Sequence, residues 1–96
     1  MFVTIIKFPP IKEGKDEQFR RWFEESNREF AKFPGFVRRR LLKPYRGGTY
    51  VGLVEHENPE SFMGMHNSPR HDGLREMVAP IFDGKPEPAF YQVVIE

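Results

Sequence analysis

The sequence predicts an α+β fold of the ferredoxin-like type, a sandwich in which helices cover one face of a four-stranded antiparallel sheet. The predicted elements follow the order strand, helix, strand, strand, helix, strand. Residues 44–48 (PYRGG) have the composition of a tight turn, which joins the second and third strands as a hairpin. Because 96 residues suffice for one domain and leave no room for a second, we expect a single domain over residues 1–96.

The first strand and the first helix have the clearest patterns. Residues 2–8 (FVTIIKF) are rich in β-branched and aromatic side chains and end at two prolines, which predicts a strand. In residues 15–33, apolar side chains recur at three- and four-residue steps, and Pro34-Gly35 ends the pattern, which predicts an amphipathic helix. The stripe consists of Phe19, Trp22, Phe23, Phe30 and Phe33, with Ser26 in its gap. We interpret this stripe as core.

The second half of the chain predicts a hairpin, two short helical pieces and a last strand. Residues 36–43 and 49–56 form the hairpin strands. Asn58-Pro59 and Ser68-Pro69 each place a capping residue before a proline, which is typical of a helix start. The second helical piece then covers residues 70–78, a loop covers 83–88, and residues 89–95 (AFYQVVI) form the last strand.

Both faces of the first and last strands carry apolar side chains. In the first strand, Phe2, Ile6 and Phe8 alternate with Val3 and Ile5. A sheet with one face in water would show polar side chains on that face. A second copy of the chain is the simplest cover, so we predict a homodimer that packs face to face.

The composition excludes several classes of protein. The net charge of +1 and a pI near 8.1 do not favour a nucleic-acid partner. The absence of cysteine excludes disulfides and thiolate chemistry. No apolar run has the length of a signal peptide or a membrane span, so we expect a cytoplasmic protein with no membrane partner. No phosphate-binding glycine loop or nucleophile elbow is present, which disfavours nucleotide chemistry and serine hydrolysis.

Residues 30–54 contain six Lys or Arg residues and no Asp or Glu. Strand alternation places Arg38 and Arg40 on one face, and Arg39 with Lys43 on the other. Three interpretations remain open. The charges can protect an edge strand from pairing with other chains, Arg38 or Arg40 can hold a carboxylate or enolate, or the segment can contact nucleic acid.

His66 and His71 are the histidines that we consider for chemistry. Their five-residue spacing does not place two ligands on one helical face, and no acidic residue completes a set of metal ligands. We therefore predict no metal site. The two histidines either cap helix ends, or one of them lines a pocket and transfers a proton near neutral pH.

Three short motifs occur in a recognisable order: Lys12-Glu13-Gly14-Lys15, Pro34-Gly35-Phe36, and His66-Asn67-Ser68-Pro69-Arg70-His71. Together with the order of elements, they resemble the antibiotic biosynthesis monooxygenase family of dimeric α/β barrels. The resemblance implies two ferredoxin-like protomers packed sheet to sheet, each with a pocket between its sheet and its helices. It also implies oxidation of a small aromatic, quinol-type substrate by O2 without a cofactor, because a deprotonated electron-rich substrate can itself reduce oxygen.

The resemblance suggests roles for eight residues. The candidates are His66 and His71 as the catalytic base, Arg38 and Arg40 as binding groups for the substrate anion, Phe62 and Met65 as the apolar wall, and Tyr50 and Tyr91 as hydrogen-bonding groups.

Two alternatives to this function stay open. The superfamily includes haem-degrading monooxygenases, which use an Asn, a Trp and a His ligand where this chain has Lys7, Met65, and Leu74 or Arg75. Haem binding would then require His71 as a substitute ligand. The other alternative is a dimeric module that binds a small molecule without catalysis, in which both histidines are structural.

Overall fold

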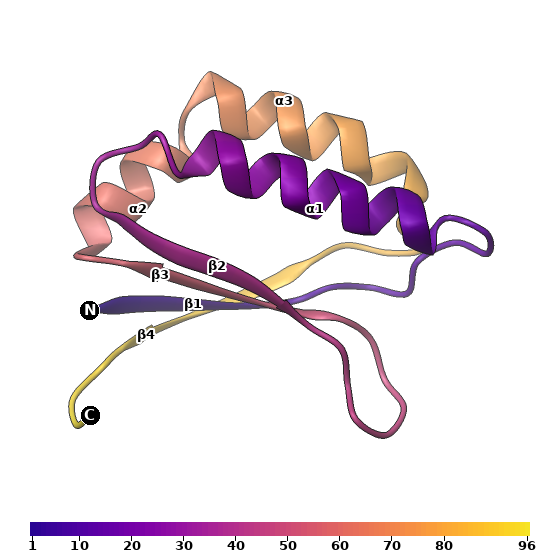
Figure 1. Cartoon of the computed structure of the whole chain (residues 1–96), viewed down its shortest axis with the longest axis horizontal. Coiled ribbons are helices and arrows are strands. Elements are labelled where there is room, and N and C mark those ends of the chain that lie inside the picture. Colours follow the sequence, from indigo (N-terminus) through magenta and orange to yellow (C-terminus); the bar gives the residue numbers. More distant parts are fainter.

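The computed structural model describes all 96 residues. Its elements are β1 (Phe2–Lys7), α1 (Asp16–Phe30), β2 (Phe36–Leu42), β3 (Val51–His56), α2 (Pro59–His66), α3 (Pro69–Val78), the short 3-10 helix η1 (Ala79–Ile81) and β4 (Glu87–Gln92). The strands form one antiparallel sheet in the order β2-β3-β1-β4. The three α-helices lie together on one face of this sheet (Figure 1). The predicted ferredoxin-like fold is therefore confirmed.

The last strand differs from the prediction in its position. It covers Glu87–Gln92 instead of residues 89–95, so it begins inside the predicted loop. Its partner β1 sets these limits, because Glu87 pairs with Lys7 and Gln92 pairs with Phe2 at the two ends of β1. Proline at position 88 is tolerated because β4 is an edge strand, where a missing N–H costs no ladder bond.

The aromatic stripe of α1 packs on the sheet, as predicted. Phe19, Phe23 and Phe30 are buried, and Ser26 is fully buried between them. The Trp22 indole donates a hydrogen bond to the carbonyl of Leu74 at 2.8 Å, which links α1 to α3. The resulting core has two adjoining parts. The first contains Phe8, Phe19, Phe23, Tyr50, Val78, Ile81 and Phe82, and the second contains Phe30, Val54, Phe62, Met65 and Leu74.

A glycine fixes the turn between α1 and β2. Gly35 has a φ of 81°, and a Cβ atom at this position would overlap the Ser61 side chain of α2. α1 ends at Phe30, before the predicted end at residue 33, and Gly35 allows the turn that follows to pack against α2.

The opposite face of the sheet has no covering element within the chain (Figure 1). The strand register aligns two rows of residues on this face: Arg38, Glu55, Val3 and Tyr91 in one, and Arg40, Leu53, Ile5 and Ala89 in the other. Both arginines pair with Glu55, each with an N–O distance of 3.2 Å. No helix of the chain combines the length and the apolar character that crossing a membrane requires.

Candidate functional site

A cavity of about 540 Å³ lies between the sheet and the helices. This volume is in the range of sites for small molecules. Its walls are mostly apolar and come from β1, β3 and all three helices. Its lining includes aromatic, histidine and polar side chains: Thr4, Trp22, Phe30, Arg39, Phe62, Met65, His66 and His71. Solvent-exposed lining residues from α3 and from the segment before β4, among them Glu76 and Lys85, mark the open side.

Two helix caps bring the candidate histidines together. Asn58 caps α2 by accepting a hydrogen bond from the Ser61 N–H at 2.8 Å, and Ser68 caps α3 by accepting one from the His71 N–H at 3.2 Å. The chain breaks between the two helices, so His66 ends α2 and His71 lies in the first turn of α3. Their ring centroids are 4.5 Å apart. The five-residue spacing would keep the two side chains on different faces of one continuous helix, but the break between α2 and α3 brings their rings into contact.

Both imidazoles are uncharged at neutral pH. Burial first, and then the nearby His66, Arg75 and Arg39, lower the pKa of His71 to about 4. The pKa of His66 is also lowered, mainly by burial and then by Arg75. The Nδ1 atom of His71 is buried and has no hydrogen-bond partner in the protein. Each ring can therefore accept a proton or a hydrogen bond from a bound molecule.

Arg39 places a buried positive charge at the same cavity. It points from β2 toward the helices and is only 8% exposed. Its Nη1 donates hydrogen bonds to Ser26 Oγ and, at 2.9 Å, to Asn27 Oδ1. Its guanidinium carbon lies 4.0 Å from the ring centroid of Phe23. Burial lowers the pKa of Arg39 to about 9, so the group remains charged at neutral pH.

Arg39 was not among the candidates predicted from the sequence, although two signals were present. Strand alternation placed Arg39 on the face opposite Arg38 and Arg40, and the helices cover that face. Ser26 interrupts the aromatic stripe of α1, and its small polar side chain leaves room and an acceptor for the guanidinium. The two observations together would have identified Arg39 as a buried cation.

The other candidates lie in three places: the histidine cavity, the uncovered sheet face and, for Tyr50, a second cavity. Phe62 and Met65 line the cavity beside the histidines, and each is 3% exposed. Arg38, Arg40 and Tyr91 lie on the uncovered face of the sheet, away from this cavity, because successive strand residues point to opposite sides.

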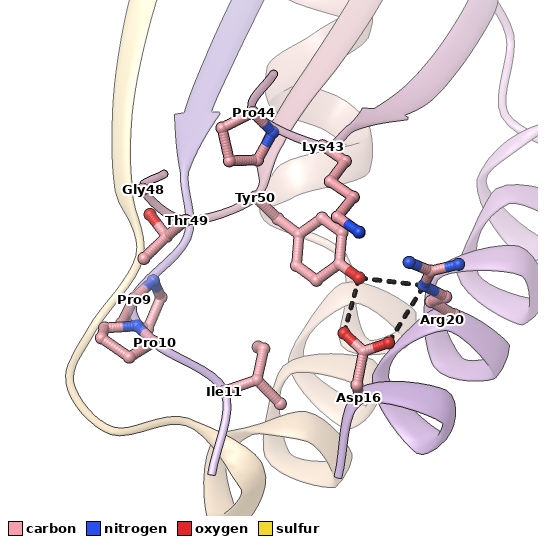
Figure 2. A pocket seen from close by; sticks show the side chains of 10 residues that line it. All are labelled: Pro9, Pro10, Ile11, Asp16, Arg20, Lys43, Pro44, Gly48, Thr49 and Tyr50. Carbon is pink, nitrogen blue, oxygen red and sulfur yellow. Dashed lines mark hydrogen bonds and ion pairs between the residues drawn. The ribbon is translucent and has the colours of Figure 1, made fainter. Parts of the chain in front are cut away.

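Tyr50 lies at a second cavity, of about 390 Å³, which Figure 2 shows in close-up. This cavity is bordered by the β2–β3 hairpin, the segment after β1 and the start of α1. The Tyr50 hydroxyl accepts a hydrogen bond from Arg20 Nε at 2.9 Å and donates one to Asp16 Oδ1 at 2.5 Å. Asp16 Oδ2 lies 3.2 Å from the same Arg20 nitrogen. The three groups satisfy one another, and the network ties the hairpin to α1.

One more polar atom faces the larger cavity without a partner. Thr4, on the central strand β1, is fully buried, and its Oγ1 makes no hydrogen bond in the protein. An unsatisfied buried polar atom costs about 1–3 kcal/mol. Thr4 Oγ1 and His71 Nδ1 are therefore two positions at which a bound molecule with polar atoms would gain hydrogen bonds.

The chain is a ferredoxin-like α+β protein with a cavity of the size of a small molecule between its sheet and its helices. Residues 1–77 match the family described as antibiotic biosynthesis monooxygenase, and the chain belongs to this family. A search of functionally curated proteins finds no significant match.

Solved structures with the same fold include three distant relatives. Rv0793 from Mycobacterium tuberculosis is 14% identical with a TM-score of 0.85, over 99% of this chain and 96% of its own. SnoaB, a cofactor-independent oxygenase from Streptomyces nogalater, is 20% identical with a TM-score of 0.78, over 99% of this chain and 92% of its own. The haem degrader MhuD from Mycobacterium tuberculosis is 21% identical with a TM-score of 0.79, over 100% of this chain and 98% of its own.

Proposed function

We propose that the protein is a cofactor-independent monooxygenase that oxidises a small phenolic or quinol-type aromatic substrate with O2. The active site is the cavity that His66 and His71 line. The contact of these two uncharged imidazoles with a buried arginine beside them, inside an apolar cavity, carries the proposal. Membership of the family and the likeness to SnoaB support it.

His71 is the proposed base. Its unpartnered Nδ1 accepts the proton of the substrate hydroxyl, and the charge of Arg39 favours the phenolate that forms. The electron-rich ring then reduces O2. For a phenol with a free para carbon, one oxygen atom joins that carbon, the other leaves as water, and the product is a quinone. The apolar walls, including Phe62 and Met65, keep bulk water from the reactive anion.

We further propose that two protomers pair through the uncovered sheet face. This face carries Val3, Ile5 and Leu53, which are partly buried but not covered by any element of the chain. In such a dimer, Arg38, Arg40 and Tyr91 lie at or beside the interface. Their proposed role then shifts from substrate binding to subunit pairing, because they face away from the histidine cavity.

Haem binding is the second candidate function. The observation that favours it is an uncharged imidazole, His71, with a free ring nitrogen in an apolar cavity, since the neutral ring is the form that ligates iron. The likeness to MhuD supports it. His71 would hold the iron, and Phe62, Met65 and Leu74 would contact the macrocycle.

Two measurements on metal-free and flavin-free protein test these candidates. Oxygen consumption with a panel of phenols, at one O2 per quinone formed and without release of hydrogen peroxide, supports the monooxygenase. A stoichiometric Soret shift on adding haemin, lost in His71→Ala, supports haem binding instead. If neither signal appears, both candidate functions are rejected, and the non-catalytic binding module is the function that remains.

A further inference from the structure

Arg39 is a buried cation for which the chain provides no anion. All ion pairs of the structure involve other residues, and no carboxylate lies within ion-pair distance of Arg39. Its protein partners are two neutral oxygens, on Ser26 and Asn27, and aromatic rings. A buried charge is costly unless an opposite charge and hydrogen bonds compensate it. The compensation within the chain is therefore incomplete.

The unused N–H donors of Arg39 indicate which chemical group would compensate its charge. A guanidinium has five N–H donors. Nη1 uses its two on Ser26 and Asn27, which leaves the three on Nε and Nη2 without an acceptor in the protein. Nε and Nη2 together present the side-on pair of donors that a carboxylate accepts through both oxygens.

The surroundings of Arg39 indicate an aromatic body for the ligand. Trp22, Phe30 and Phe62 line the cavity. The Phe30 ring contacts both polar ends of the site: its centroid lies 5.0 Å from the Arg39 guanidinium carbon and 5.7 Å from the centroid of His71, with which it stacks. One aromatic ligand lying along Phe30 can thus place a carboxylate at Arg39 and a hydroxyl at His71.

The charges around the cavity favour an anion as well. Its lining contains three basic side chains, Arg39, Arg75 and Lys85, and one acidic side chain, Glu76. Arg75 pairs with Asp72 at 3.3 Å, outside the lining. Even with Asp72 included, the basic side chains at the cavity outnumber the acidic ones.

We propose that the site selects phenolic aromatic acids: the ionised carboxylate of the ligand docks on Nε and Nη2 of Arg39, and its hydroxyl faces His71. This inference rests on the proposed function in one respect, because it takes the cavity as the substrate site. It narrows the substrate class from neutral phenols to hydroxylated aromatic carboxylates.

Binding without turnover tests the proposal. The probes are 6-hydroxy-2-naphthoate and its neutral amide, 6-hydroxy-2-naphthamide, titrated anaerobically at pH 7.5 by calorimetry. Quenching of Trp22, the only tryptophan of the chain and a lining residue, reports on the site itself. We expect the acid to bind at least tenfold more tightly than the amide. Equal affinity for the two probes would overturn the proposal.

Substitutions in β2 test whether Arg39 causes the preference for the acid. In Arg39→Met the preference for the acid should disappear, and in Arg39→Lys it should be partly retained, because an ammonium cannot form the bidentate pair. Arg40→Met is the matched control, since Arg40 lies on the opposite face, and it should keep the full preference. If Arg39→Met does not fold, the thermal shift of the wild-type protein decides: the acid should raise the melting temperature more than the amide does.

Different results would overturn the proposed preference for aromatic acids and the proposed monooxygenase function. A tenfold preference for the acid without any oxygen consumption would retain the binding site and reject the monooxygenase. Oxygen consumption with neutral phenols and no preference for acids would retain the monooxygenase and reject the role of Arg39.

Discussion

The imidazole rings of His66 and His71 are in contact, with centroids 4.5 Å apart, although the two residues belong to different helices. Ser68 caps α3, and only Asn67 and Ser68 separate the end of α2 from the start of α3, which brings the two rings together. The pair is uncharged at neutral pH and lines an apolar cavity beside Arg39. The proposed deprotonation of a bound phenol rests on this arrangement, in which the neutral His71 ring has a free acceptor nitrogen.

Replacement of His71 should abolish most of the activity. In His71→Gln the side chain can still hydrogen-bond but cannot accept the substrate proton, so kcat/KM for oxygen consumption should fall by about 10²- to 10⁴-fold. Met77→Ala, an exposed change on the same helix, is the control and should leave the rate unchanged. Activity within threefold of the wild type in His71→Gln would exclude His71 as the base.

Acid should destabilise the fold through its histidines. The pKa values of His56, His66 and His71 are lowered mainly by burial, that of His71 to about 4. Below the ordinary value of 6.5, the unfolded chain therefore binds more protons than the folded one. The free energy of unfolding should fall as pH decreases from about 6.5 toward 4. Urea unfolding at several pH values should show this slope, and His71→Gln should make it shallower. Identical slopes in the two proteins would contradict the low pKa of His71.

Removal of the buried charge should not weaken the unliganded protein. Arg39→Met removes the cost of burying an incompletely compensated cation but leaves the Ser26 and Asn27 oxygens without this donor, so the two effects should nearly cancel. Denaturant unfolding without ligand measures this change. A loss of several kcal/mol would show that Ser26, Asn27 and the aromatic rings already compensate Arg39 fully.

Ser26 should matter only while Arg39 is present. Its hydroxyl accepts a hydrogen bond from Arg39 Nη1 and donates one to the carbonyl of Phe23. Ser26→Ala should therefore cost about 1–3 kcal/mol in the wild type, because a charged donor loses its acceptor. The same change in the Arg39→Met background should cost clearly less. A double-mutant cycle gives this coupling, and equal costs in both backgrounds would mean that the contact contributes nothing.

The second cavity should be independent of the first. Tyr50→Phe removes the hydroxyl that joins Asp16 to Arg20 and should reduce stability by about 0.5–1.5 kcal/mol. Binding at the histidine cavity, followed through Trp22 fluorescence, should not change. A weaker ligand affinity in Tyr50→Phe would indicate that the two cavities are coupled.

Pairing through the sheet should be sensitive to a single charge. Ile5→Glu places a carboxylate in the middle of the uncovered face, so the protein should become a monomer while keeping its fold. Light scattering should give twice the monomer mass of 11.4 kDa for the wild type and the monomer mass for the variant. A monomeric wild type at micromolar concentration would reject the proposed dimer.

The fold was predictable because each element carried its own signal. The stripe of α1 and the two capped helix starts are local patterns, and the structure has them where the sequence indicated, although α1 ends at Phe30, ahead of Pro34-Gly35. The limits of β4 were predicted less well, because the pairing with β1 sets them and leaves Val94 and Ile95 outside the sheet.

The site was predictable only in part. Phe62, Met65 and the histidines share one cavity, as expected from the resemblance to the family. The arginine at that cavity is Arg39, because the choice between strand faces depends on which face the helices cover. Tyr50 and Tyr91 illustrate the same limit: residue type indicated hydrogen-bonding ability, but tertiary contacts decide which cavity or face each side chain meets.

Oxygen-isotope labelling shows whether the product carries an oxygen atom that comes from O2. Protein free of metal and flavin is incubated under ¹⁸O₂ with an oxidisable phenolic substrate, and the product is reduced at once to prevent exchange with water before mass spectrometry. We expect one ¹⁸O atom per product molecule, with formation lost in His71→Gln. Product without label, or equal labelled product in the wild type and His71→Gln, would contradict it.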